Sequence, residues 1–238
     1  MIEFTLKLAD VPAGVICRYP STKEYCSRFL TAEQPVFTVS VEEADYRFEQ
    51  QTLGDQKYSD AYLELLAVYR KLCEGLVPFG IFLLHGSAVA VDGEAYIFIA
   101  LSGTGKSTHT ALWRRLLSEE HEVVMVNDDK PLIRVTEQAV FVCGTPWNGV
   151  HRLSENVCVP VKAICVLDRA AENRIEPVDA AKAFPVFLRQ SYRPSDPALL
   201  IQLLDLLGEV RHRVSFYHLG CNMEPEAAEL AYQVMKEG

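Results

Sequence analysis

The residues with the most specific chemistry lie at positions 102–107, which read Ser-Gly-Thr-Gly-Lys-Ser. This stretch matches the phosphate-loop pattern G-x-x-x-x-G-K-[ST] at every position but the first, where Ala100 replaces glycine. Gly103 and Gly105 allow the backbone to turn its N–H groups inward around phosphate oxygens. The helix that should follow adds about half a positive charge at its N-terminus. The stretch therefore predicts a site for the phosphates of a nucleotide.

Lys106 and Ser107 supply the charged and metal-binding groups of this predicted loop. The ammonium group of Lys106 can reach the β- and γ-phosphates, and the hydroxyl of Ser107 can bind Mg²⁺. The alternative is a glycine-rich turn that carries Lys-Ser by chance, but a strand before the loop and a helix after it favour the phosphate loop. The predicted phosphate-binding residues are Ser102, Gly103, Thr104, Gly105, Lys106, Ser107 and Thr108.

Two adjacent carboxylates form a second candidate site. Asp128 and Asp129 follow the apolar residues 123–126, as Mg²⁺-binding acids do in phosphate-loop enzymes. Twenty-one positions separate Ser107 from Asp128, which is room for one helix and one strand, so both sites should meet at one edge of a sheet. One carboxylate can hold Mg²⁺ while the other accepts a proton from an attacking hydroxyl. Taken alone, the pair is more typical of a turn.

Hydrophobic periodicity predicts the elements that position these groups. Residues 81–91 are interpreted as one strand, followed by a hairpin turn at Asp92-Gly93 between two apolar runs. The continuous apolar run at 95–100 predicts a strand buried on both faces. Further strands are expected at 2–7, 15–19, 36–41, 123–126, 132–135, 139–143, 157–167 and 214–219, and helices at 60–73, 107–117, 178–190, 196–207 and 224–236. Gly75 and Gly208 are expected to end two of these helices. The residues of the 107–117 helix expected to face the sheet are Ala111, Leu112, Leu116 and Leu117.

The bulk composition limits the class of protein. The chain of 238 residues is 49% hydrophobic and 23% charged, and its formal net charge of -9 argues against a nucleic-acid partner. No apolar run approaches the roughly 20 residues of a membrane helix, and the first residues lack the features of a signal peptide, so we expect a cytoplasmic protein with no membrane partner. The seven cysteines are scattered without a C-x-x-C pair, which favours buried thiols over disulfides or metal ligands.

These motifs together resemble a known family. Leu84-His85-Gly86 before a hairpin, the phosphate loop at 102–107 and Asn127-Asp128-Asp129 soon after it resemble the catalytic domain of HPr kinase/phosphorylase, which shares its fold with the phosphoenolpyruvate carboxykinases. The resemblance covers about residues 80–170. It is greatest to small HPr-kinase-like proteins that also carry Gly-Thr-Pro-Trp, here residues 144–147. Some of those proteins are linked with phosphorylation of serine in ribosomally made peptides.

The resemblance implies an α/β phosphate-loop fold with a mixed sheet and flanking helices. It implies a catalytic domain at 76–238. The residues at 1–75 are interpreted from their own pattern as a small α/β appendage, either separate from the core or integral to it. By position, Asp128 matches the general base of the family, Asp129 its metal-associated acid and His85 a histidine near the base. Arg152 could offset the charge of the transferred phosphoryl group. Trp147 could shape an acceptor pocket, stack a base or simply anchor its loop.

The function expected from these residues is transfer of the γ-phosphoryl group of ATP, with Mg²⁺, to a hydroxyl. The expected acceptor is a serine of a peptide or protein, or free serine. The HPr-recognition signature does not follow the Asp pair, and the first 75 residues differ from the N-terminal domain of the family. Two alternatives remain: a nucleotide-binding regulatory module without transfer, and an NTP hydrolase that uses water. The sequence also leaves open ATP against GTP and whether the chain forms a homo-oligomer.

Overall fold

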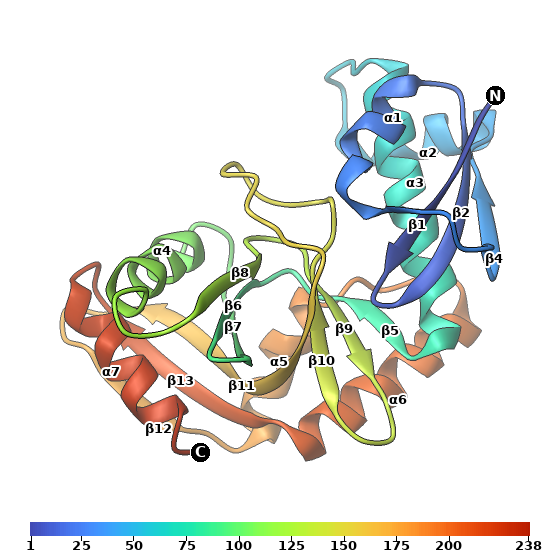
Figure 1. Cartoon of the computed structure of the whole chain (residues 1–238). Helices are drawn as coiled ribbons and strands as arrows, with labels where there is room; N and C mark the ends of the chain where they lie inside the picture. The colour runs from blue at the N-terminus through green and yellow to red at the C-terminus, as the bar shows by residue number, and fades with distance from the viewer.

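The protein is a mixed α/β protein with two mixed β-sheets, and the computed structural model describes all 238 residues. Its N-terminal part holds a four-stranded sheet of order β3-β1-β2-β4. The strands are β1 (Ile2–Leu8), β2 (Val11–Cys17), β3 (Leu30–Thr31) and β4 (Phe37–Ser40). The helices of this part are α1 (Pro20–Tyr25), α2 (Glu43–Leu53) and α3 (Asp60–Leu76), with a short 3₁₀ turn at Ser27–Phe29. Figure 1 shows this unit, in blue and cyan, beside the larger sheet.

The predicted first and third strands are confirmed, whereas the second begins earlier than expected. The antiparallel pair β1–β2 is joined at Ala9 and Asp10, which both have positive φ angles, so the turn continues the pairing up to Val11. Helix α3 begins at Asp60, is capped by the hydroxyl of Ser59, which accepts a hydrogen bond from the N–H of Tyr62, and runs through Gly75 to Leu76. The prediction that Gly75 ends this helix was wrong. A Cβ atom there would lie 2.4 Å from the ring of Phe37, so close packing accounts for the glycine.

The second sheet contains nine strands in the order β5-β9-β10-β11-β7-β6-β8, with β13 beside β11 and β12 beside β13. The strands are β5 (Ile81–Leu83), β6 (Ser87–Val91), β7 (Glu94–Ile99), β8 (Val123–Asn127), β9 (Leu132–Val135), β10 (Val140–Cys143), β11 (Cys158–Arg169), β12 (Arg174–Pro177) and β13 (Ser215–Cys221). The helices are α4 (Lys106–Leu117), α5 (Ala180–Gln190), α6 (Pro197–Arg213) and α7 (Pro225–Met235), and a 3₁₀ turn spans Val77–Phe79. None of the helices in the structure is long and apolar enough to span a membrane.

Helices cover both faces of this sheet. Trp113 of α4 and Tyr232 of α7 pack with Tyr96 and Phe98 on one face, whereas Phe187 of α5 and the leucines of α6 pack on the other. Figure 1 shows α4 and α7 together on the left, away from α6. Strand β7 is buried on both faces, as predicted. The prediction for α4 was partly wrong. Trp113 is fully buried against the sheet, whereas Ala111 is exposed.

Strand directions bring the ends of four strands to one edge of the sheet. Strands β7, β11 and β13 run parallel to one another. Strand β8 is antiparallel to β6, and β6 is antiparallel to β7, so β8 also runs in the direction of β7. The predicted hairpin at Asp92-Gly93 makes this possible, because both residues have the positive φ angles of a tight turn. The loop after β7 and the acidic residues after β8 therefore lie at the same edge.

Three further expectations are corrected by the structure. The apolar segment at 81–91 forms two strands that are separated by a break at residues 84–86. Strand β5 lies at one edge of the sheet, and β6 lies between β7 and β8 near the other. Gly208 does not end its helix, since α6 continues to Arg213. Cys143 and Cys158 form a disulfide across the antiparallel pair β10–β11, where their backbones lie opposite each other, whereas the other five cysteines are free.

Candidate active site

The predicted phosphate loop connects β7 to the N-terminus of α4. Gly103 and Gly105 have φ angles of 80° and 125°, which side chains other than hydrogen rarely allow. A Cβ atom at either glycine would meet nothing within 4 Å, so backbone conformation rather than crowding requires these glycines. Residues 101–103 are exposed, and the free N-terminus of α4 follows directly. This local structure can accept phosphate oxygens on backbone N–H groups and at a helix N-terminus.

Lys106 lies beneath the phosphate loop and is largely buried. Its exposed fraction is 8%, and its Nζ donates a long hydrogen bond of 3.4 Å to the carbonyl oxygen of Ala100. Burial lowers the pKa of Lys106, and the nearby carboxylate of Asp129 opposes part of that shift. The ammonium group thus has only one weak partner in the protein and is available to an incoming anion.

Arg169 is a residue of this site that the sequence did not reveal. It ends β11, the parallel neighbour of β7, and its guanidinium donates to the carbonyl oxygens of Thr104, at 3.2 Å, and of Gly103. These bonds hold the carbonyl side of the phosphate loop against the sheet edge. Only the strand order places Arg169 there, because 62 residues separate it from Ser107.

Asn127, at the end of β8, organises the carboxylate site. Its side-chain Oδ1 accepts hydrogen bonds from the backbone N–H groups of Asp129, at 2.9 Å, and Lys130, at 2.6 Å. Its Nδ2 donates to Thr145 and to the carbonyl oxygen of Trp147. Asn127 is fully buried. One amide therefore fixes the turn that carries both aspartates and ties it to the Gly-Thr-Pro-Trp loop.

Asp128 is buried and has one oxygen without a partner. It is 3% exposed, and its Oδ1 accepts a hydrogen bond of 2.6 Å from the backbone N–H of Gly149. Its Oδ2 is buried and has no hydrogen-bond partner in the protein. A Cβ atom at position 149 would lie 3.1 Å from that Oδ2, so glycine permits the close approach. A carboxylate with a fixed orientation and an unpaired oxygen is well suited to accept a proton or a cation.

Asp129 is surrounded by cationic and polar groups instead. Its Oδ1 lies 3.1 Å from Nε2 of His85, and its Oδ2 lies 3.8 Å from Nζ of Lys130. Burial alone would raise the pKa of Asp129, but His85, then Lys130 and Lys106, outweigh it and hold the pKa below its usual range. Asp129 is therefore ionised at neutral pH. The resemblance placed His85 near the base Asp128, whereas in the structure its imidazole contacts the carboxylate of Asp129.

The phosphate loop and the carboxylate turn meet in one cavity of about 340 Å³. Ser107 and Thr110 of α4 line it from one side, and Asp128 and His151 line it from the other. Figure 1 shows the segment after β10, in yellow, that carries His151 above this edge of the sheet. The structure thus brings together Ser107 and Asp128 as the sequence predicted, and adds His151, for which the sequence carried no signal.

Arg152 does not line this cavity. Its own φ angle is 52°, and with Arg28 and Arg114 it lines an adjacent cavity of about 390 Å³. Arg114, Met125 and Leu153 belong to both cavities, so the two are continuous. Arg28 pairs with Glu155 at 2.5 Å. Arg114 and Arg152 make no ion pair in the structure, so a net positive charge stands beside the Ser107–Asp128 cavity of this acidic protein.

Trp147 is a packed anchor of its loop. It is 4% exposed, and its ring stacks on Tyr69 of α3 at a centroid distance of 4.6 Å. Tyr25 of the N-terminal unit lies at 6.4 Å. Of the three roles that the sequence left open for Trp147, the structure supports anchoring, because its buried ring offers no face to a base.

Comparison with known proteins gives a distant, fold-level resemblance. No family model matches this sequence, and a search of curated proteins finds no match either. Among solved structures, the HPr(Ser) kinase/phosphatase from Coxiella burnetii is similar over 66% of this chain and 99% of that chain, with 12% sequence identity and a TM-score of 0.35. A likeness of this size confirms no activity, so function has to be argued from the site itself.

Proposed function

We propose that the protein is a Mg²⁺-ATP-dependent kinase that transfers the γ-phosphoryl group of ATP to a hydroxyl, namely a serine of a peptide or protein, or free serine. One observation carries this proposal: Ser107, at the end of the phosphate loop, and Asp128, with its unpaired Oδ2, line the same cavity. Phosphoryl transfer requires these two groups at one point, a hydroxyl that helps hold the metal and a carboxylate that receives a proton.

The residues present fit Mg²⁺ as part of a nucleotide complex. No group of three or more His, Cys, Asp or Glu side chains is arranged to hold a metal in the structure. Mg²⁺ in kinases is held by one or two protein ligands together with phosphate oxygens and water. Ser107 presents an exposed hydroxyl, and Asp129 is ionised. These two residues would hold the metal, which when bound supplies charge neutralisation on the β- and γ-phosphates.

The transfer step uses the remaining groups of the cavity. The oxygen of the acceptor hydroxyl forms a bond to the γ-phosphorus while the bond from that phosphorus to the bridging oxygen breaks, and ADP leaves with the electron pair. The hydroxyl proton passes to Asp128, whose other oxygen is fixed by the N–H of Gly149. Lys106 offsets negative charge on the phosphates. His85 orients Asp129 through the contact between its Nε2 and Oδ1 of that carboxylate.

The acceptor side is the part of the cavity that opens toward Arg114 and Arg152. These guanidinium groups stand outside the Ser107–Asp128 cavity or at its border. Their place favours a role in holding the acceptor over the role that the sequence suggested for Arg152, contact with the transferred phosphoryl group. Cationic side chains at this border favour an acceptor that carries negative charge near its hydroxyl, such as a serine in an acidic peptide.

The experiment that tests the proposal is a phosphate-transfer assay with γ-labelled ATP and Mg²⁺. Free serine, neutral seryl peptides, acidic seryl peptides and HPr are offered in parallel, with Asp128→Asn as the control. We expect label on an acidic seryl peptide, lost in the variant. Label released only as inorganic phosphate would replace the kinase by a hydrolase. ATP binding without release or transfer of label would replace it by a regulatory nucleotide-binding module.

A further inference from the structure

A second cavity lies on the other side of the phosphate loop from Asp128. It encloses about 440 Å³ and is lined by Gly103 and Gly105 of the loop, by Thr108 of α4, and by residues at the carboxyl ends of β11 and β13. Arg169 and Ala170 come from the first of these ends, and Cys221 and Asn222 from the second. In open α/β sheets, ligands bind outside the carboxyl ends of parallel strands. The cavity occupies that position.

The two cavities flank the phosphate loop through neighbouring residues of α4. Ser107 lines the Asp128 cavity, and Thr108 lines the 440 Å³ cavity. A triphosphate that lies along the loop with its γ end toward Ser107 and Asp128 therefore directs its other end toward the 440 Å³ cavity. That end of a nucleotide carries the ribose and the base.

His109 provides an unpaired donor at this cavity. It is 3% exposed, and its Nε2 accepts a hydrogen bond of 3.0 Å from Nε1 of Trp113. Because an indole N–H can only donate, Nε2 must be the acceptor, and the proton of the neutral ring is on Nδ1. Nδ1 is buried and has no partner in the protein.

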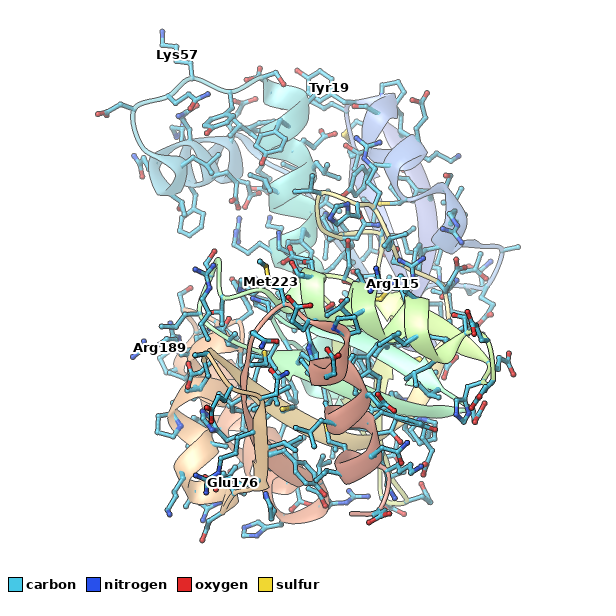
Figure 2. The ribbon with its side chains drawn as sticks, turned by 90° about the vertical axis from the view of Figure 1, so that its left-hand side faces the viewer. Tyr19, Lys57, Arg115, Glu176, Arg189 and Met223 are labelled. Atoms are coloured by element: carbon cyan, nitrogen blue, oxygen red, sulfur yellow. A yellow bond between two sulfur atoms is a disulfide. The ribbon has the colours of Figure 1, made fainter.

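An unpaired buried N–H is costly, and buried polar groups in proteins nearly always have a partner. The walls around His109 have the character of a nucleoside site. Leu112 and Leu167 are apolar, and Met223, which is labelled in Figure 2, forms part of the lining from the segment after β13. The volume lies in the usual range of small-molecule pockets, roughly 300–1,000 Å³. Apolar side chains with a few polar groups among them, here including His109, Thr108 and Asn222, form the kind of lining that binds a small ligand.

We propose that the 440 Å³ cavity holds the base and ribose of the nucleotide, and that Nδ1–H of His109 donates a hydrogen bond to an acceptor atom of the base. This assignment rests on the proposed function, because it requires a triphosphate in the loop. A nucleoside site would allow the protein to bind a nucleotide in preference to inorganic polyphosphate. His109 is a binding residue in this account and takes no part in the transfer of the phosphoryl group.

Two substitutions at His109 separate its two nitrogen atoms. In His109→Gln, the amide oxygen can replace Nε2 as the acceptor for Trp113, but the donor at the position of Nδ1 is lost. In His109→Asn, the amide N–H₂ can replace Nδ1 as the donor, but Trp113 loses its partner. If His109 only supported Trp113, the Asn variant would be the more damaged of the two. If its donor binds the base, the Gln variant is the more damaged in ATP binding.

A third substitution does not depend on the buried histidine. Ala170 is exposed and lines the cavity, so Ala170→Trp fills the cavity from its rim without disturbing the core. It should weaken the binding of ATP and leave the binding of inorganic tripolyphosphate unchanged. This variant keeps the proposal testable if a substitution at His109 prevents folding.

The measurement is isothermal titration of Mg²⁺-ATP and of Mg²⁺-tripolyphosphate into the wild type and the three variants. We expect the wild type to bind ATP more tightly than tripolyphosphate, and His109→Gln to bind ATP about tenfold more weakly. Tripolyphosphate should bind all four proteins equally. Equal affinities of the wild type for ATP and tripolyphosphate, or unchanged ATP binding in both His109→Gln and Ala170→Trp, would overturn the nucleoside site alone. If the wild type bound neither ligand, the proposed function would fail as well.

Discussion

Replacing Asn127 with alanine tests how the acidic turn is held in place. The Asn127 amide makes five contacts, two as acceptor from Asp129 and Lys130 and three as donor to Thr145 and Trp147. Two amide hydrogens serve the three donor contacts, so we count four independent hydrogen bonds. Each contributes about 1 kcal/mol net, and the sum is about 4 kcal/mol. Folded domains have a stability of roughly 5–15 kcal/mol, so the variant should still fold.

The assay for Asn127→Ala combines urea unfolding with turnover. We expect a loss of about 3–4 kcal/mol in the free energy of unfolding and a loss of turnover, because Asp128 and Asp129 lose their common support. Asn127→Asp is the matched control, since it keeps the oxygen that accepts from residues 129 and 130 and loses the donor to the Gly-Thr-Pro-Trp loop. A variant Asn127→Ala with stability within about 1 kcal/mol of the wild type and full turnover would refute this account of the turn.

Three further predictions concern the loop, the acceptor side and the buried histidine. Lys106→Ala should abolish phosphoryl transfer in the labelled-ATP assay, and near-normal activity would contradict the mechanism. Arg114→Gln should raise KM for an acidic seryl peptide about tenfold with little change for ATP; equal effects on a neutral peptide would argue against an anionic acceptor. The pKa of His109 is lowered from 6.5 to about 4 in the folded protein, so the unfolded chain takes up a proton first as the pH falls. The free energy of unfolding should therefore be highest above pH 6.5 and fall by roughly 3 kcal/mol as the pH drops to 4. Urea unfolding of His109→Gln should lack this pH-dependent loss.

The sequence predicted the local structure at the centre of the candidate site because the signals for it are local. The Asp92-Gly93 turn, the buried strand at 94–99 and the start of the helix near Lys106 each depend on residues that are neighbours in the chain. The same holds for Asp128 and Asp129, since the end of an apolar strand can be recognised from sequence. Strand directions then bring the loop and the acids to one edge, which is the relation that the spacing of 21 positions indicated.

The groups that tune the site could not be predicted, because they depend on strand order. Arg169 meets the phosphate loop only because β11 lies beside β7. The hydrogen bond from Trp113 occupies Nε2 of His109 and leaves Nδ1 as its donor. The cavity beside His109 exists only because the end of β13 forms its far wall. The sequence shows that His109 and Trp113, four residues apart on one helix, are neighbours. Only the packed structure shows that the other ring nitrogen of His109 has no partner.

The predictions for Gly75 and for the cysteines were wrong for the same physical reason. Gly75 resembled a helix stop, but it lies inside α3 where the ring of Phe37 leaves no room for a Cβ atom. Cys143 and Cys158 looked like unrelated buried thiols, but the antiparallel register of β10 and β11 sets them opposite each other as a disulfide. In both cases a contact with a segment that is distant in the sequence determines the role of the residue. Local pattern contains no information on that contact.

The central claim is that Asp128 receives the acceptor proton in a cavity that it shares with Ser107. The most direct test measures Mg²⁺-ATP affinity and phosphoryl transfer on the same preparation of Asp128→Asn, which keeps the size of the side chain and the hydrogen bond from Gly149. We expect ATP affinity within about threefold of the wild type and transfer at least about 100-fold slower. Transfer at the wild-type rate by a folded Asp128→Asn would contradict it.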